Sequence, residues 1–134
     1  TPMQKEFGEV ERLENEIIIK RFGTEDVVGK AMFETRKIPI EHFHITDLDI
    51  FKQGDRGLGF ASQLLEETEK MSQETGKPVV LLDVIDPDNS PNAVGLYRKR
   101  GWLEARSSEH PDFVYYIFGD DKAAVDQLVE QKRK

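Results

Sequence analysis

The sequence predicts a single α/β (α+β) domain with a mixed, mostly antiparallel twisted sheet and flanking helices. Its 134 residues are enough for one hydrophobic core and too few for two. In the first third of the chain, apolar residues alternate with polar ones, as in an antiparallel meander. From residue 60 onward the spacing becomes helical. The order strands, helix, strand, helix and two strands is typical of a sheet covered by helices.

Strands are expected throughout the first 51 residues. Residues 7–13 alternate weakly and fit either a strand or a short helix. The β-branched run in 17–22 and the apolar residues of 27–33 and 42–51 predict three clearer strands. Because turn-forming residues such as Gly23 make the connections short, neighbouring strands are expected to pair antiparallel.

A helix is expected over residues 60–74. Its apolar residues fall on one stripe, and charged side chains such as Glu69 are expected to face solvent. Gly76 and Pro78 follow where a helix ordinarily ends. The inward stripe consists of Phe60, Ala61, Leu64, Leu65, Thr68 and Met71.

The rest of the chain is expected to hold three strands and two helices. Residues 79–84 are apolar on both faces, which predicts a buried central strand. A short helix over 92–100 is followed by a hairpin with arms at 102–105 and 113–118. The last helix covers 122–132. Its N-cap is Asp120 or Asp121, and Val125, Leu128 and Val129 are expected to face inward.

The composition excludes several classes of function. The chain has 26 acidic and 19 basic side chains, and its net charge of −7 argues against a broad nucleic-acid footprint. It has no apolar run long enough to span a membrane and no secretion signal, and Met3 is the expected natural start. Without cysteine there is no disulfide, zinc thiolate site or thiol nucleophile. We therefore expect a cytoplasmic protein with no nucleic-acid or membrane partner.

A glycine-rich loop before the first helix predicts an anion site. Gly57 and Gly59 let the backbone approach a phosphate, and the helix start offers unpaired amides and a positive dipole end. Turn geometry alone is an equally good explanation of these glycines. A nucleoside-triphosphate loop is excluded because Phe60 and Ala61 stand where Lys and Ser or Thr are needed. A dinucleotide fingerprint, with Asp83 as its acidic residue, is a minor rival.

Two segments resemble the signatures of the GNAT N-acetyltransferase family. The first, GDRGLGFASQLL at 54–65, is similar to the coenzyme-A loop Arg/Gln-x-x-Gly-x-Gly/Ala and the helix that follows it. The second, NSPNAVGLYRKRGW at 89–102, is similar to Asn-x-x-Ala-x-x-Leu-Tyr-x-x-x-Gly-Phe. With the strands around them, the two signatures extend the resemblance over residues 43–118.

The sequence departs from the family pattern at three places. Gly54 stands where the loop usually has Arg or Gln, and Gln53 lies one residue too early. Asn89 lies one residue too far from Ala93, so Asn89 and Asn92 are both candidates for the asparagine. The chain before residue 42 has room only for strands, so the helices that commonly wall the acceptor pocket are expected to be reduced or absent.

The resemblance implies an N-acetyltransferase that moves an acetyl group from acetyl-CoA to a primary amine by direct attack on the thioester. The strand ending near Ile50 would splay from 79–84, and the pantetheine arm would pair with it. The pyrophosphate would bind the amides of 56–61, with a basic patch nearby that consists of Arg98, Lys99, Arg100 and Lys52. The implied coenzyme contacts are Leu48, Asp49, Ile50, Gly54, Asp55, Arg56, Gly57, Leu58, Gly59, Phe60, Ala61, Asn89, Asn92, Tyr97 and Arg100.

Tyr97 and His44 are the expected catalytic residues. A phenol stays protonated at neutral pH and can protonate the leaving thiolate, so Tyr97 fits a general acid. His44 shares strand parity with Leu48 and Ile50 and fits a general base, with Asp47 and Asp83 as weaker alternatives. No metal is expected, since His42 and His44 have only His110 as a third histidine.

The acceptor is expected to be a small molecule or a peptide amine, and a second copy of the chain is a candidate for completing the site. The alternative is a coenzyme-A-binding regulatory or partner module of the same fold without transferase activity.

Overall fold

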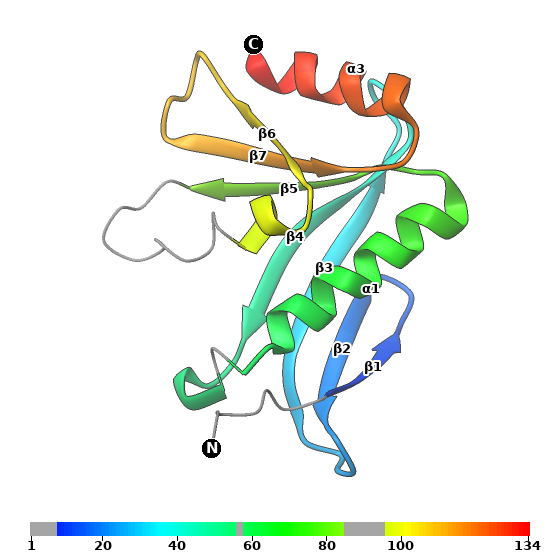
Figure 1. Cartoon of the computed structure of the whole chain (residues 1–134), viewed down its shortest axis with the longest axis vertical. Coiled ribbons are helices and arrows are strands. Elements are labelled where there is room, and N and C mark those ends of the chain that lie inside the picture. Colours follow the sequence, from blue (N-terminus) through cyan, green and yellow to red (C-terminus); the bar gives the residue numbers. More distant parts are fainter. Residues whose placement is uncertain (1–7, 56–57, 85–95) are drawn as a thin grey trace.

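A seven-stranded sheet forms the centre of the molecule (Figure 1). The computed structural model describes residues 8–55, 58–84 and 96–134, with the side chains of residues 83 and 84 left aside. The strand order is β1-β2-β3-β4-β5-β7-β6, and all neighbours are antiparallel except β4 and β5, which are parallel. The strands are β1 (Gly8–Arg12), β2 (Glu16–Arg21), β3 (Val27–Arg36), β4 (His42–Ile50), β5 (Val79–Val84), β6 (Leu103–Arg106) and β7 (Phe113–Phe118).

The predicted antiparallel meander is confirmed in β1 to β4. Residues 7–13, which fitted a strand or a helix, contain strand β1, and a short turn leads from it into β2. Strand β3 reaches Arg36, three residues beyond the predicted end, because Glu34, Thr35 and Arg36 pair with the start of β4. Within residues 8–50 the structure contains strands and turns and no helix, as expected for a shortened N-terminal part.

The helix α1 (Phe60–Thr75) begins and ends at glycines with left-handed backbone. Gly59 has a φ of 96° at its start, and Gly76 has a φ of 76° at its end, where its amide donates to the carbonyl of Ser72. α1 lies across the face of β1 to β5 (Figure 1). Its Phe60, Leu64 and Leu65 are buried there, as the stripe predicted.

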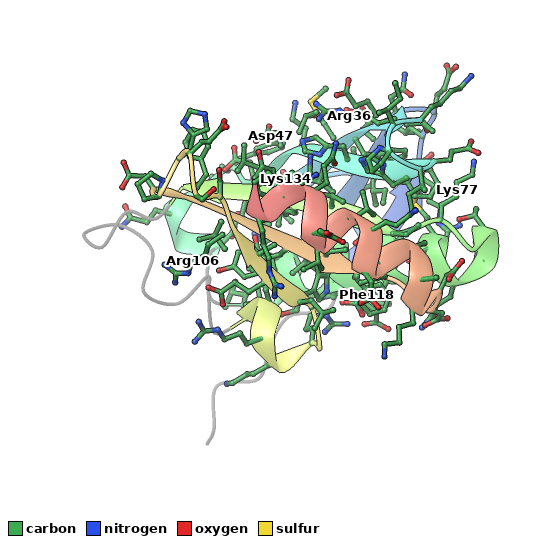
Figure 2. The ribbon with its side chains drawn as sticks, turned by 90° about the horizontal axis from the view of Figure 1, so that it is seen from above. Arg36, Asp47, Lys77, Arg106, Phe118 and Lys134 are labelled. Atoms are coloured by element: carbon green, nitrogen blue, oxygen red, sulfur yellow. The ribbon has the colours of Figure 1, made fainter. Side chains whose placement is uncertain are left out.

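The helix α3 (Lys122–Arg133) packs on β6 and β7 (Figure 2). Asp121 is its N-cap, since its carboxylate accepts from the amide of Ala124 at 3.3 Å. The inward residues are the predicted ones, and they meet Val80 and Ile117 in a second core. Neither α1 nor α3, the helices with described bounds, is long and apolar enough to cross a membrane.

Strand β5 separates the two cores. Val79 and Leu81 belong to the core under α1, and Val80 belongs to the core under α3. This confirms the prediction of a strand buried on both faces for most of its length. Leu82 departs from it, with 37% of its surface exposed. By that point β4 no longer lies beside it.

The prediction for Glu69 is wrong. Glu69 was expected to face solvent, but it is 9% exposed. It is covered by residues 100–102, which follow the short helical turn at 96–99. Its carboxylate accepts from Nε and Nη2 of Arg100 at 2.7 and 2.9 Å, and from Nε1 of Trp102 at 2.9 Å. Helical spacing cannot show this, because the covering residues lie about 30 positions further along the chain.

Candidate functional site

A β-bulge in β4 sets up the candidate site. Met32 pairs with Asp47 and the next residue of β3, Phe33, pairs with Ile45, so Thr46 is an extra residue on β4. The bulge reverses the alternation of side chains along the strand. Ile45 before it and Leu48 after it therefore both face the core under α1.

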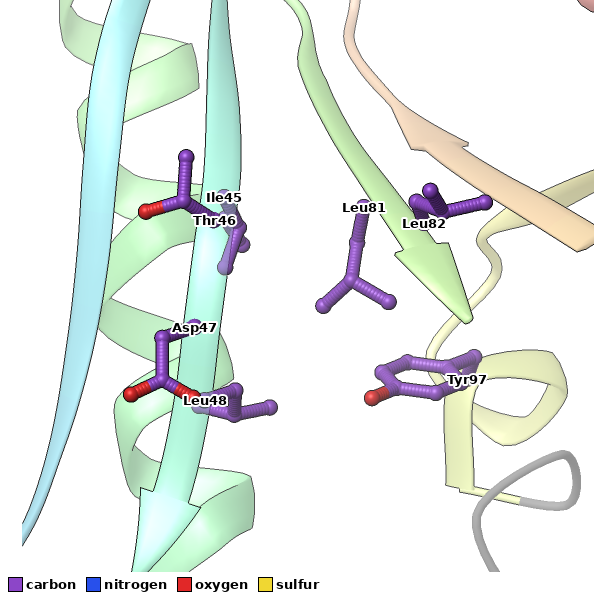
Figure 3. Close-up of a pocket in the computed structure, with 7 residues that line it drawn as sticks. All are labelled: Ile45, Thr46, Asp47, Leu48, Leu81, Leu82 and Tyr97. Carbon is purple, nitrogen blue, oxygen red and sulfur yellow. The ribbon is translucent and has the colours of Figure 1, made fainter. Parts of the chain in front are cut away.

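Beyond the bulge, β4 and β5 diverge. The last residue pair that joins them is Ile45 with Leu81, and the strands then separate (Figure 3). The predicted slot is confirmed here as a cavity of about 210 Å³. It is lined by Ile45, Thr46, Asp47, Leu48, Leu81, Leu82 and Tyr97.

Tyr97 faces this cavity from the short helical turn at 96–99. Its ring is 6% exposed and stacks on Tyr116 with ring centroids 4.5 Å apart. Trp102 lies on another side of the ring at 5.9 Å. The phenol oxygen points across the gap toward Leu48 of β4 (Figure 3). Packing on two aromatic rings therefore fixes a hydroxyl at the edge of the slot.

The predicted placement of His44 beside Leu48 and Ile50 is wrong. His44 comes before the bulge and pairs with Val80, a member of the core under α3. Parity counted along the sequence missed the extra residue at Thr46 and assigned His44 to the wrong face. The side chain is 6% exposed, and it is not among the residues that line the cavity.

The surroundings of His44 keep its imidazole neutral. Burial, followed by the positive charges of Arg36 and Lys132, lowers the pKa of His44 from 6.5 to about 4, with His42 adding to this and Glu34 opposing it. Its Nδ1 is buried and has no hydrogen-bond partner in the described parts of the chain.

His44 should make stability fall with acidification between pH 6.5 and 4. Its pKa is lower in the folded protein than in the unfolded chain, so below pH 6.5 the unfolded chain binds the proton more readily. The stabilising effect of the neutral ring is present above pH 6.5 and is lost as the pH falls to about 4. Urea unfolding at several pH values should show this slope, and His44→Asn should remove most of it. His110→Asn, at an exposed histidine, should leave the slope unchanged; equal slopes in all three proteins would contradict this role.

The described part of the glycine-rich loop offers free amides. Among the residues with structure, the amides of Leu58, Gly59, Phe60 and Ala61 donate no hydrogen bond, and α1 has no side-chain cap. Arg56 and Gly57 lie outside the described residues. The four described amides, of residues 58–61, lie at the N-terminus of α1, where unpaired amides and the helix dipole together can bind an anion.

Turn geometry explains one loop glycine and not another. Gly59 needs its left-handed φ of 96°. Gly54 does not have positive φ, and a side chain there would meet no atom within 4 Å. Asp55, a predicted coenzyme contact, has another role. Its amide donates to the carbonyl of Lys52, and its carboxylate accepts from Nη2 of Arg21 at 2.7 Å, so it ties the loop to β2.

Replacing Gly59 should weaken the coenzyme-A binding that the family resemblance implies. In Gly59→Ala, the left-handed φ destabilises the start of α1 by about 1 kcal/mol and displaces the amides, so we expect about tenfold weaker binding by calorimetry. Gly76→Ala is the matched control, since it has the same backbone strain at the other end of α1 and open space around it. It should lose similar stability and keep its affinity. Equal affinity in both variants would show that the loop backbone does not bind the coenzyme.

The other predicted contacts divide into three groups. Leu48, Asp49 and Ile50 lie on the half of β4 beyond its pairing with β5, as the slot requires. Asn89 and Asn92 lie outside the described residues, and so does the side chain of Asp83. Arg100 was predicted to contact the coenzyme, but in the structure its guanidinium forms an ion pair with Glu69.

Two features of the site were not predicted correctly. The basic patch is partly neutralised, because Arg98 pairs with Glu104 at 2.7 Å. Thr46, Leu81 and Leu82 were not predicted to line the slot, and Asp47 was only a weaker candidate for the base. The sequence signal for them was indirect, since the bulge that sets the face of Asp47 relative to Ile45 depends on pairing with β3.

Solved acetyltransferases have the same fold. Naa50 from Arabidopsis thaliana, in complex with the bisubstrate analogue CoA-Ac-MVNAL, superposes with a TM-score of 0.61 at 18% identity over 76% of this chain and 70% of its own. Ard1 from Thermoplasma volcanium gives 0.60 at 18% over 78% and 70%. A GNAT acetyltransferase from Staphylococcus aureus gives 0.59 at 16% over 76% and 65%. The chain therefore has the GNAT acetyltransferase fold.

Comparison of the sequence with family models and curated proteins does not show a family. No family model matches the chain. One curated relative, the phosphomevalonate dehydratase large subunit of Aeropyrum pernix, is 34% identical over 86 residues, which are 64% of this chain and 20% of that protein. The match thus spans about a fifth of that relative's length.

Proposed function

Starting from the GNAT acetyltransferase fold of this chain, we propose that it is an N-acetyltransferase that uses acetyl-CoA and a primary amine. The observation that carries this proposal is the cavity between the diverging strands β4 and β5, with the phenol of Tyr97 at its edge (Figure 3). The free amides of residues 58–61 at the start of α1 fit the pyrophosphate of the coenzyme.

The proposed reaction is a direct acyl transfer. The amine nitrogen, in its neutral form, attacks the thioester carbonyl carbon. A carbon–nitrogen bond forms, the carbon–sulfur bond breaks, and the amine loses its extra proton to solvent. Tyr97 gives a proton to the departing thiolate and regains one from water. The backbone of β4 from Leu48 to Ile50 positions the acyl-carrying arm as an added strand would be positioned.

Calorimetry and a thiol-release assay together test the proposal. The protein should bind coenzyme A, and with acetyl-CoA it should release thiol only when a primary amine is present. The panel should contain peptides with free N-termini and small amines, because Naa50 is a structural neighbour crystallised with a peptide-derived analogue. Absence of coenzyme-A binding would refute the proposal.

A coenzyme-A-binding module without transferase activity is the second candidate. It is favoured by one observation: residues 8–50 form strands and turns only, so no helix from this part of the chain walls the acceptor side. This candidate predicts coenzyme-A binding with no thiol release for any amine. A second copy of the chain or a bulky peptide acceptor could supply the missing wall.

A further inference from the structure

The cavity between β4 and β5 is lined from both faces of the sheet. Leu48 and Tyr97 belong to the side covered by α1. Asp47 and Leu82 line it from the opposite face. Asp47 is placed there by the bulge, since it pairs with Met32, whose neighbours Ala31 and Phe33 both face α1. In Figure 3, α1 lies behind β4, and Thr46 and Asp47 are on the near side.

The two faces can admit two different molecules. The free amides of residues 58–61 lie at the start of α1, so a coenzyme bound to them occupies the α1 side of the slot. On the opposite face α3 packs on β6 and β7, away from this part of β4. Met32 and Leu82 are accordingly 36% and 37% exposed. An acceptor therefore has an open approach from the face opposite α1.

Asp47 is the charged side chain at this approach. Of the residues that line the cavity, it and the phenol Tyr97 are the ones that can ionise. Asp47 is exposed, and its carboxylate makes no hydrogen bond or ion pair with any described residue. A carboxylate without a partner at the mouth of a cavity attracts cations and repels anions.

We propose that Asp47 is a specificity-determining residue that binds a second positive charge of the amine acceptor, entering from the face opposite α1. This inference rests on the proposed acetyltransferase function. The reacting nitrogen must reach the thioester in its neutral form on the Tyr97 side, and Asp47 lies on the other side of the strand. A diamine can place one nitrogen at each position, whereas a monoamine leaves Asp47 without a ligand.

Acetylation rates with matched acceptors test the inference. The acceptors are diamines of three to six carbons, the alkyl monoamines of equal length, and the corresponding ω-amino acids. The wild-type protein should prefer one of the diamines to its monoamine by about fivefold in kcat/KM, the upper end of what an exposed charged pair contributes. Asp47→Asn should remove this preference by lowering kcat/KM for the diamine to the value for its monoamine. Asp47→Lys should favour the ω-amino acid. Asp126→Asn, at an exposed aspartate on α3, is the control and should match the wild type.

The outcomes separate this inference from the proposed function. An equal loss with diamine and monoamine in Asp47→Asn would overturn it, because a residue needed for every amine acts on the reaction rather than on the second charge. A wild type without preference would also overturn it. If no amine releases thiol, the proposed function fails. Binding of the best-fitting diamine to the coenzyme-A complex, measured by calorimetry, then decides the inference: loss of binding in Asp47→Asn alone supports it, and its retention refutes it.

Discussion

Replacing Tyr97 by Phe should lower acetyl transfer by about 10²- to 10³-fold and leave coenzyme-A affinity within twofold. A positioned general acid contributes rate enhancement of this size. The ring of Phe keeps the stacking on Tyr116 and the contact with Trp102, so the fold of the segment is retained. The loss then belongs to the hydroxyl, which faces the cavity (Figure 3). Thiol release with the best amine, and calorimetry with coenzyme A, measure the two quantities.

Tyr115→Phe is the matched control for this experiment. Tyr115 is the residue next to Tyr116 on β7 and contacts Lys132 of α3, on the face away from α1. Loss of its hydroxyl should leave turnover unchanged. Full turnover in Tyr97→Phe would reject the role of Tyr97 as general acid.

Most of the fold could be predicted because its signals are local. The alternation in β2, the two-sided apolar run of β5 and the stripe of α1 each follow from burial of the side chains in one segment. The glycines at both ends of α1 reflect a backbone requirement that a single residue satisfies. In each of these elements, the residues that determine the structure lie close together in the sequence, so the sequence pattern alone predicts it.

The site was less predictable because its geometry depends on pairing between strands. One extra residue at Thr46 puts His44 on the face opposite Leu48, the same face as Asp47, and nothing in β4 itself marks that residue. The partner of Glu69 was equally hidden, since Arg100 and Trp102 come from a different segment. The motif around Tyr97 placed the phenol at the slot, because there the family resemblance carried information on tertiary structure.

Replacing Glu69 by Ala should destabilise the protein by about 3 kcal/mol or more. The substitution leaves the half-buried guanidinium of Arg100 without its carboxylate and removes the acceptor of the Trp102 indole, which is 3% exposed. Removing one member of a buried ion pair ordinarily costs about 3–5 kcal/mol. Glu69→Gln should cost less, because an amide oxygen still accepts from the indole. The free energy of unfolding in urea measures both.

The same substitution should also impair function, because Glu69 holds the segment that carries Tyr97. Arg100 and Trp102 follow Tyr97 closely in sequence, and their bonds to Glu69 fix that segment against α1. Glu66→Ala is the control: this exposed glutamate lies 3.6 Å from Lys70 on the same helix, and its loss should change stability by less than about 1 kcal/mol. If Glu69→Ala is as stable as Glu66→Ala, the buried ion pair does not anchor the segment. If it is unstable but, while folded, turns over at the wild-type rate, the phenol is positioned by the aromatic stack on Tyr116 alone.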